Sequence, residues 1–196
     1  MAPETVYLCE GSTDASKEVT YAWDAQIYHA IFHNSYPQID FVSVGGQAEL
    51  KIAGEIATVV APGSTRLRLR DRDSLTISAR QKQLDEDPNL RILERRTLKS
   101  YLVDDEIIAK LATEYGLRPD KNVADMTGAR EAAITAAKQD DNAKTAVGAV
   151  YATAKAVLRK NGQLGENASQ FSRDVLARLV TPDTAVYAEL QKVLGL

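Results

Sequence analysis

The chain has 196 residues, somewhat more than the ~150 usual for one domain, so we expect one globular domain with an appendage. Its composition, 44% hydrophobic and 26% charged residues, excludes a disordered, collagen-like or low-complexity chain. The 24 Lys and Arg against 27 Asp and Glu give a net charge of −3, which excludes a protein that coats nucleic acid by bulk positive charge.

The sequence also indicates a compartment. Cys9 is the single cysteine and cannot form an internal disulfide, which favours a reducing environment. The first residues lack the pattern of a signal peptide, and no apolar run approaches the ~18 residues of a membrane span. We therefore expect a cytoplasmic protein that makes no membrane contact.

The first half of the chain alternates strand and helix patterns. We expect strands at Thr5–Cys9, Ile39–Val44, Thr65–Asp71 and Leu90–Leu93, and helical segments that end at Phe32 or cover Gln47–Val60 and Ser74–Gln83. Strands separated by helical crossovers predict an α/β fold with a parallel sheet of about four strands.

The second half contains no strand pattern. Helices are predicted at Asp104–Tyr115, Lys121–Gln139, Ala143–Lys160, Ser169–Leu179 and Thr184–Leu194. We expect a domain over residues 1–117 and an all-helical C-terminal extension over residues 118–196.

Acidic residues follow two of the predicted strands. Glu10 and Asp14 come after the first strand, and Asp71 and Asp73 come after the third. The carboxyl ends of parallel strands carry the ligand sites of open sheets, and clustered carboxylates are the oxygen ligands that Mg²⁺ takes. The sequence therefore predicts a divalent-cation site at this sheet edge.

Five runs of the sequence resemble a known family. VYLCEGSTD, WDAQIYHAIF, FVSVGGQAEL, LRLRDRD and LERRTLKSYLVDDEII are similar to the TOPRIM (topoisomerase-primase) domain of OLD-family nucleases, which usually follows an ABC-type ATPase domain. The resemblance covers about the first two-thirds of the chain, and LVTPDTAVYAEL is similar to the ends of such proteins.

The resemblance implies an endonuclease that depends on Mg²⁺ or Mn²⁺, cleaves DNA or RNA and serves phage defence. It implies that Glu10 is a metal ligand or general acid/base, that Asp71 and Asp73 bind metal, and that Asp14 is a further acidic ligand. It also implies an ABC-type ATPase domain or subunit as partner, since the chain itself has no G-x-x-x-x-G-K-[ST] motif. Homo-oligomers are compatible with it.

Lys99 departs from the family pattern, which commonly has a glutamate there. Lys99 either removes a ligand of a second cation or neutralises charge on the phosphate, and Asp104 or Asp105 could replace the ligand. We expect Lys99 to lie close to the acidic residues and count it among the catalytic candidates.

Nucleic-acid contacts are expected from guanidinium groups, which match phosphate in a bidentate way. The candidates are Arg72, Arg95 and Arg96, and Gly45 and Gly46 could let a phosphate approach the following helix. Each has a simpler interpretation: the arginines form salt bridges or pack on a helix, and the glycines end a strand.

Other residues have structural interpretations. The acids could be helix caps and turn residues, His29 and His33 are favoured as surface histidines, and Cys9 as a packed small hydrophobe. Two functions compete with nuclease activity: a receiver-like domain that binds Mg²⁺ and accepts a phosphoryl group, and a degenerate TOPRIM scaffold without catalysis. The receiver interpretation needs adjacent acids after the first strand, and Glu10-Gly11 does not supply them.

Overall fold

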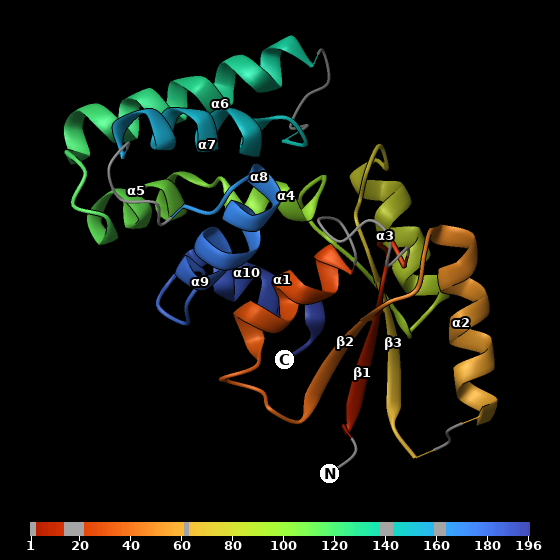
Figure 1. Ribbon diagram of the computed structural model, residues 1–196. Coiled ribbons are helices and arrows are strands. Elements are labelled where there is room, and N and C mark those ends of the chain that lie inside the picture. Colours follow the sequence, from red (N-terminus) through yellow and green to blue (C-terminus); the bar gives the residue numbers. More distant parts are fainter. Residues whose placement is uncertain (1–2, 14–21, 61–62, 138–142, 159–163) are drawn as a thin grey trace. The chain divides into compact units, whose positions relative to one another are not determined.

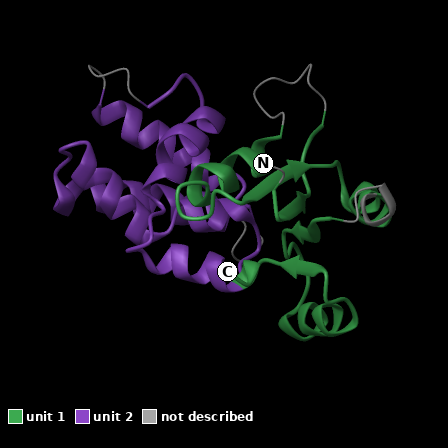
Figure 2. Cartoon of the chain, turned by 90° about the horizontal axis from the view of Figure 1, so that it is seen from below, with its two compact units in different colours: residues 1–94, 193–196 green, residues 95–192 purple. Residues whose placement is uncertain are grey.

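The computed structural model describes residues 3–13, 22–60, 63–137, 143–158 and 164–196. The chain forms two compact units, shown in different colours in Figure 2. The α/β unit consists of residues 1–94 and 193–196, and the helical unit of residues 95–192. The units thus divide after Glu94, upstream of the boundary at residue 117 that the sequence suggests. The reason is that α4 (Leu98–Leu102) and α5 (Asp105–Glu114) pack against other helices of the second unit.

The α/β unit contains a four-stranded parallel sheet with the strand order β2-β1-β3-β4 (Figure 1). The strands are β1 (Thr5–Cys9), β2 (Ile39–Ser43), β3 (Thr65–Arg70) and β4 (Leu90–Ile92). The connecting helices are α1 (Trp23–Phe32), α2 (Gln47–Val60) and α3 (Ile77–Glu86). The predicted fold class, a parallel α/β sheet followed by helices, is confirmed.

An aromatic cluster fills the sheet face under α1. Phe41 of β2 stacks on Tyr7 of β1 and on Tyr28 of α1, with ring centroids 5.1 and 5.4 Å apart. The ring centroid of Phe32 lies 6.1 Å from that of Phe41, and Phe32 is fully buried. The apolar positions of the first predicted helix therefore fix α1 to β1 and β2 by burying large rings.

The opposite face of β3 carries arginines, and the chain's own helices cover it. Arg68 forms an ion pair with Asp87 at the end of α3, and Arg70 donates to Gln83 within α3. A Cβ atom at Gly54 of α2 would stand 3.0 Å from Cδ of Arg68, so the glycine lets α2 lie close over that side chain. The alternation of Arg and Leu along β3 is thus explained within the unit.

The helical unit is built from helices alone among its described residues. Besides α4 and α5 it contains η1 (Pro119–Val123), α6 (Ala124–Ala136), α7 (Ala146–Val157), α8 (Ala168–Gln170), η2 (Phe171–Leu176), α9 (Ala177–Leu179) and most of α10 (Ala185–Leu194). Its core includes Tyr101, Ile108, Val150, Phe171 and Leu190, each fully buried. The sequence predicts these helices within a few residues, apart from α4, which is one of the short ones.

The end of α10 belongs to the α/β unit. The Tyr7 hydroxyl donates to the carbonyl oxygen of Leu194 at 2.8 Å, and Nε of Arg91 donates to the same oxygen at 3.3 Å. Two donors on strands thus hold the carbonyl end of this helix.

Within the described residues, no helix combines the length and the apolar character that a membrane crossing needs.

Candidate functional site

Glu10 and Asp71 follow neighbouring strands at the carboxyl edge of the sheet. β1 and β3 pair in parallel with Cys9 opposite Leu69, and the Glu10 amide donates to the Leu69 carbonyl at 3.0 Å. Both acidic residues are half-buried, and Oε2 of Glu10 is buried. The structure therefore brings the backbone of these two predicted site residues together at one edge.

The segment after β3 has a defined conformation. Asp73 adopts a left-handed φ of 49°, which is uncommon outside glycine and tolerated best by Asp and Asn. Arg72 anchors the segment, because its Nε donates to the Glu94 carbonyl at 2.8 Å and its Nη1 to the Leu75 carbonyl at 2.7 Å. Arg72, predicted to contact nucleic acid, thus links the ends of β3 and β4.

Two loops are tied together beside Glu10. The amide of Gly11 donates to the carbonyl of Gly45 at 2.9 Å, and the amide of Gly45 donates back at 3.0 Å. Gly45 has a φ of +102°, and a Cβ atom there would stand 3.0 Å from Cβ of Glu49. The turn therefore requires glycine for its own geometry, and a role of Gly45 and Gly46 in phosphate binding stays a prediction.

The sequence did not single out two polar residues of this edge, Asp24 and Ser43. A Cβ atom at Gly11 would stand 3.0 Å from Oγ of Ser43 and 3.3 Å from Oδ2 of Asp24. Both oxygens therefore lie close to the backbone that follows Glu10. Asp24 lies in the first turn of α1 and Ser43 ends β2, so only the pairing of the elements brings them here.

Cys9, the last residue of β1, is fully buried. Burial raises the pKa of its thiol well above the ordinary value, and the negative charge of Asp24 raises it further. A nucleophilic cysteine needs the opposite shift. The structure thus agrees with the interpretation of Cys9 as a packed side chain.

The described carboxylates of this edge are not grouped into a metal-binding site. Among the described residues, no three His, Cys, Asp or Glu side chains are grouped closely enough to hold a metal ion. Asp14, the fourth predicted ligand, lies outside the described residues. The expected metal ligands Glu10, Asp71 and Asp73 therefore share an edge of the sheet, and their convergence on one ion stays a prediction.

Lys99 and Arg96 belong to the helical unit. Lys99 is the second residue of α4, and both side chains are half-buried. Thr97, at the N-cap position of α4, is buried at 1% exposure and starts this short helix. The expected proximity of Lys99 to the acidic residues stays a prediction.

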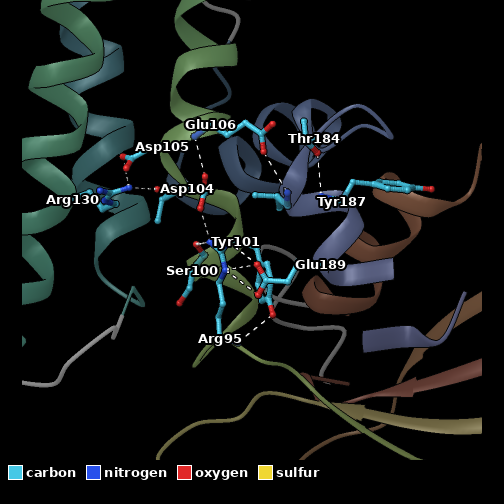
Figure 3. A network of polar contacts seen from close by, with 12 residues as sticks. Arg95, Ser100, Tyr101, Asp104, Asp105, Glu106, Arg130, Thr184, Tyr187 and Glu189 are labelled. Atoms are coloured by element: carbon cyan, nitrogen blue, oxygen red, sulfur yellow. Dashed lines mark hydrogen bonds and ion pairs between the residues drawn. The ribbon is translucent and has the colours of Figure 1, made fainter. Parts of the chain in front are cut away.

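Arg95 lies at the centre of a polar network of the helical unit (Figure 3). Its guanidinium group donates to both carboxylate oxygens of Glu189 at 2.7–3.2 Å and to Asp104 at 2.7 Å. It also lies over the Tyr101 ring, 4.6 Å from the ring centroid. Burial lowers the pKa of Arg95, but the hydrogen bonds that Arg95 donates to Glu189 and Asp104 outweigh it and raise the pKa above the ordinary value.

Asp104 is one of the two acids that could replace the missing metal ligand, and its side chain already binds groups of the helical unit. Its Oδ1 accepts the Glu106 amide at 2.9 Å and caps α5, while its Oδ2 binds Arg95. Asp105 forms an ion pair with Arg130 at 2.8 Å (Figure 3). Both acids therefore have structural roles in the helical unit.

Comparison with known proteins gives structural similarity but no family or sequence match. No family model matches the chain, and no curated protein matches it. Among solved structures, the C-terminal region of the Burkholderia pseudomallei OLD protein is similar over 100% of this chain and 98% of that chain, with 16% sequence identity and a TM-score of 0.43.

Proposed function

We propose that the chain is a TOPRIM-type, metal-dependent endonuclease module that hydrolyses phosphodiester bonds of DNA or RNA. The observation that carries the proposal is the placement of Glu10 and the Asp71-Arg72-Asp73 segment at the carboxyl ends of adjacent parallel strands. The motif resemblance of the sequence supports the same activity. It also supports a role as the effector of an ATPase-coupled phage-defence system.

Mg²⁺ or Mn²⁺ is the cofactor that this residue set fits. Carboxylate oxygens are the ligands of hard cations, and the buried Oε2 of Glu10 shows that one such oxygen points into the fold. Glu10, Asp71 and Asp73 would hold the ion, with Asp14 as a further ligand. When bound, the cation would neutralise charge on the phosphate and lower the pKa of a water molecule bound to it.

The chain's own groups then have distinct tasks. Glu10 accepts or returns a proton at its carboxylate, as a general acid/base within reach of the substrate. Arg72 fixes the segment that carries Asp71 and Asp73, through its bonds to the Glu94 and Leu75 carbonyls. Lys99 would neutralise charge on the phosphate.

Nucleic-acid binding would depend on the local arginines, given the net charge of −3. The candidates for direct phosphate contact are Arg72, Arg95 and Arg96, of which Arg72 and Arg95 also donate to groups within the chain. Loss of one phosphate contact on duplex DNA should reduce the log-log salt slope of binding by about one unit. Asp71→Ala protein and the Asp71→Ala/Arg96→Ala and Asp71→Ala/Arg72→Ala double variants should be compared over a salt series. An unchanged slope in both double variants would place the nucleic-acid surface elsewhere.

The decisive experiment measures cleavage of supercoiled plasmid and of structured RNA with Mg²⁺ or Mn²⁺. We expect cleavage by the unaltered protein and a loss of about 100-fold or more in Asp71→Asn and Glu10→Gln. Asp85→Asn is the matched control, since Asp85 is an exposed acid on α3 that binds Gln81. Full activity in Asp71→Asn would contradict the site assignment.

A folded protein that cleaves neither substrate would instead support the second candidate function, a TOPRIM-like scaffold that only binds or assembles. The observation in its favour is that no three metal-binding side chains gather among the described residues. Lys99→Glu sharpens the test, because it restores the acidic residue common in the family. Cleavage gained by Lys99→Glu would indicate a scaffold that has lost catalysis.

A further inference from the structure

A pocket lies at the amino edge of the sheet, opposite the edge that carries Glu10 and Asp71. Its volume is about 440 Å³. The residues before β1, the start of β2 with the two residues before it, and the end of α1 line it, and they include Glu4, His29, His33, Pro37 and Asp40. The proposed nuclease site uses none of these residues.

The two histidines of the chain meet in this pocket. His29 lies in the last turn of α1 and His33 directly follows the helix with α-helical backbone angles, so the two side chains lie one turn apart on the same face. Their rings stack with centroids 4.3 Å apart and an angle of 23° between the planes. Both residues are exposed, so an ion from solution can reach them.

The spacing of four residues is the one at which two histidines on a helix can share an ion. A metal-nitrogen bond to imidazole measures about 2.0–2.1 Å, so two nitrogens that share one ion lie within about 4 Å of each other. The ring centroids lie 4.3 Å apart, and each exposed side chain turns about its own single bonds to aim a nitrogen lone pair at the shared ion. Glu4 and Asp40 add negative charge to the same pocket, which favours a cation over an anion there.

We propose that His29 and His33 together bind a divalent transition-metal ion of the Zn²⁺ and Ni²⁺ type in this pocket. Imidazole suits these ions, whereas Mg²⁺ prefers carboxylate and water oxygens. No third metal-binding side chain groups with the pair among the described residues, so water completes the coordination. The protein thus has a nitrogen site at one edge of its sheet and an oxygen site at the other.

Calorimetric titration of the untagged protein with Zn²⁺, in a buffer that contains Mg²⁺, tests this site. The Mg²⁺ would fill the proposed carboxylate site at the other edge. We expect one Zn²⁺ per chain, and a loss of affinity of about tenfold or more in His29→Gln and in His33→Gln, because each variant removes one arm of the chelate. Asp71→Asn should leave Zn²⁺ binding unchanged.

The matched control keeps two histidines and breaks their register. His33→Gln/Asn34→His moves the second imidazole to an exposed neighbouring position, off the face that His29 occupies. We expect this double variant to bind Zn²⁺ as weakly as His33→Gln alone. Unchanged affinity in the single variants, or full affinity in the shifted pair, would overturn the proposal.

Discussion

The two units satisfy their arginines in different ways. In the α/β unit, Arg66, Arg72, Arg80 and Arg91 donate to backbone carbonyl oxygens, which are neutral. In the helical unit, Arg95, Arg130 and Arg173 pair with carboxylates, although Arg95 and Arg130 each donate to a backbone carbonyl as well. Arg68 of the first unit instead forms an ion pair with Asp87.

This difference has a physical consequence. A bond from a guanidinium group to a carbonyl persists when acid or salt is added, whereas an ion pair weakens when the carboxylate is protonated or screened. The helical unit should therefore respond to salt and acid more strongly than the α/β unit. The single tryptophan, Trp23, lies in α1 and reports on the α/β unit by fluorescence, while hydrogen exchange reports on both.

The largest expected effect is that of Arg95→Met. The substitution leaves the carboxylates of Glu189 and Asp104, 25% and 26% exposed, without their shared cation. We expect a loss of about 2 kcal/mol in the free energy of unfolding, reduced from the cost of a buried pair because water reaches these groups. Denaturant unfolding at low and high salt measures it, and the loss should shrink at high salt.

Arg95→Lys is the control for this prediction, since it keeps the charge and removes the bidentate geometry and the stacking on Tyr101. A smaller loss of about 1 kcal/mol is expected. Equal stability of Arg95→Met and the unaltered protein would show that the network in Figure 3 contributes nothing to folding.

Arg72→Met tests the arginines that donate to backbone carbonyl oxygens. Loss of the bonds to the Glu94 and Leu75 carbonyls should cost about 1–2 kcal/mol, and salt should leave this contribution unchanged because a carbonyl oxygen is neutral. Denaturant unfolding followed by Trp23 fluorescence is the measurement. A loss that disappears in salt would place Arg72 in an ion pair and remove the contrast between the units.

Tyr7→Phe should cost about 1 kcal/mol, because the hydroxyl is lost while Arg91 still donates to Leu194. Burial raises the pKa of Tyr7 from 10.0 to about 12, although Arg91 opposes the shift. The folded state therefore disfavours ionisation, and the stability linked to Tyr7 is present below pH 10 and lost as pH rises toward 12. An alkaline unfolding curve that is unchanged in Tyr7→Phe would contradict this.

The smallest expected effect concerns acid and the exposed Asp183. Hydrogen bonds from Thr181 and then Lys110 lower the pKa of Asp183 from 3.8 to about 2. A lowered pKa contributes stability above the ordinary value that is lost as pH falls from about 4 toward 2. The melting temperature should therefore fall over this range less steeply in Asp183→Asn than in the unaltered protein. Identical slopes in the two proteins would contradict the prediction.

The sequence predicted the elements of the fold well because their patterns are local. β1 and α2 occupy the residues expected, since a β-rich run before Glu10-Gly11 and an apolar period after Gly45-Gly46 leave little choice. α4 was missed because five residues give no periodic signal. α3 begins at Ile77 and not at Ser74, because Thr76 caps it by accepting the Ala79 amide.

The candidate site was harder to predict because it depends on which strands pair. The positions of Glu10 and Asp71 follow from parallel strands, and the motif suggested them. Asp24 and Ser43 reach the same edge through α1 and β2, and no spacing in the sequence joins them to Glu10. The partners of Arg72 and Arg95 lie up to 94 residues away, so their structural roles could not be read from neighbouring residues.

The hydrogen bond from Tyr7 to Leu194 affects the order in which the molecule can fold during translation. The two residues are 187 positions apart, and the whole helical unit is made between them. The first strand therefore leaves the ribosome long before its hydroxyl can find this acceptor, and at 5–20 residues per second the delay is roughly 10–40 s. Until α10 emerges, the phenol of Tyr7 lacks the carbonyl that its burial requires. A nascent α/β unit should thus be a better target for chaperones and proteases than the same unit in the finished chain.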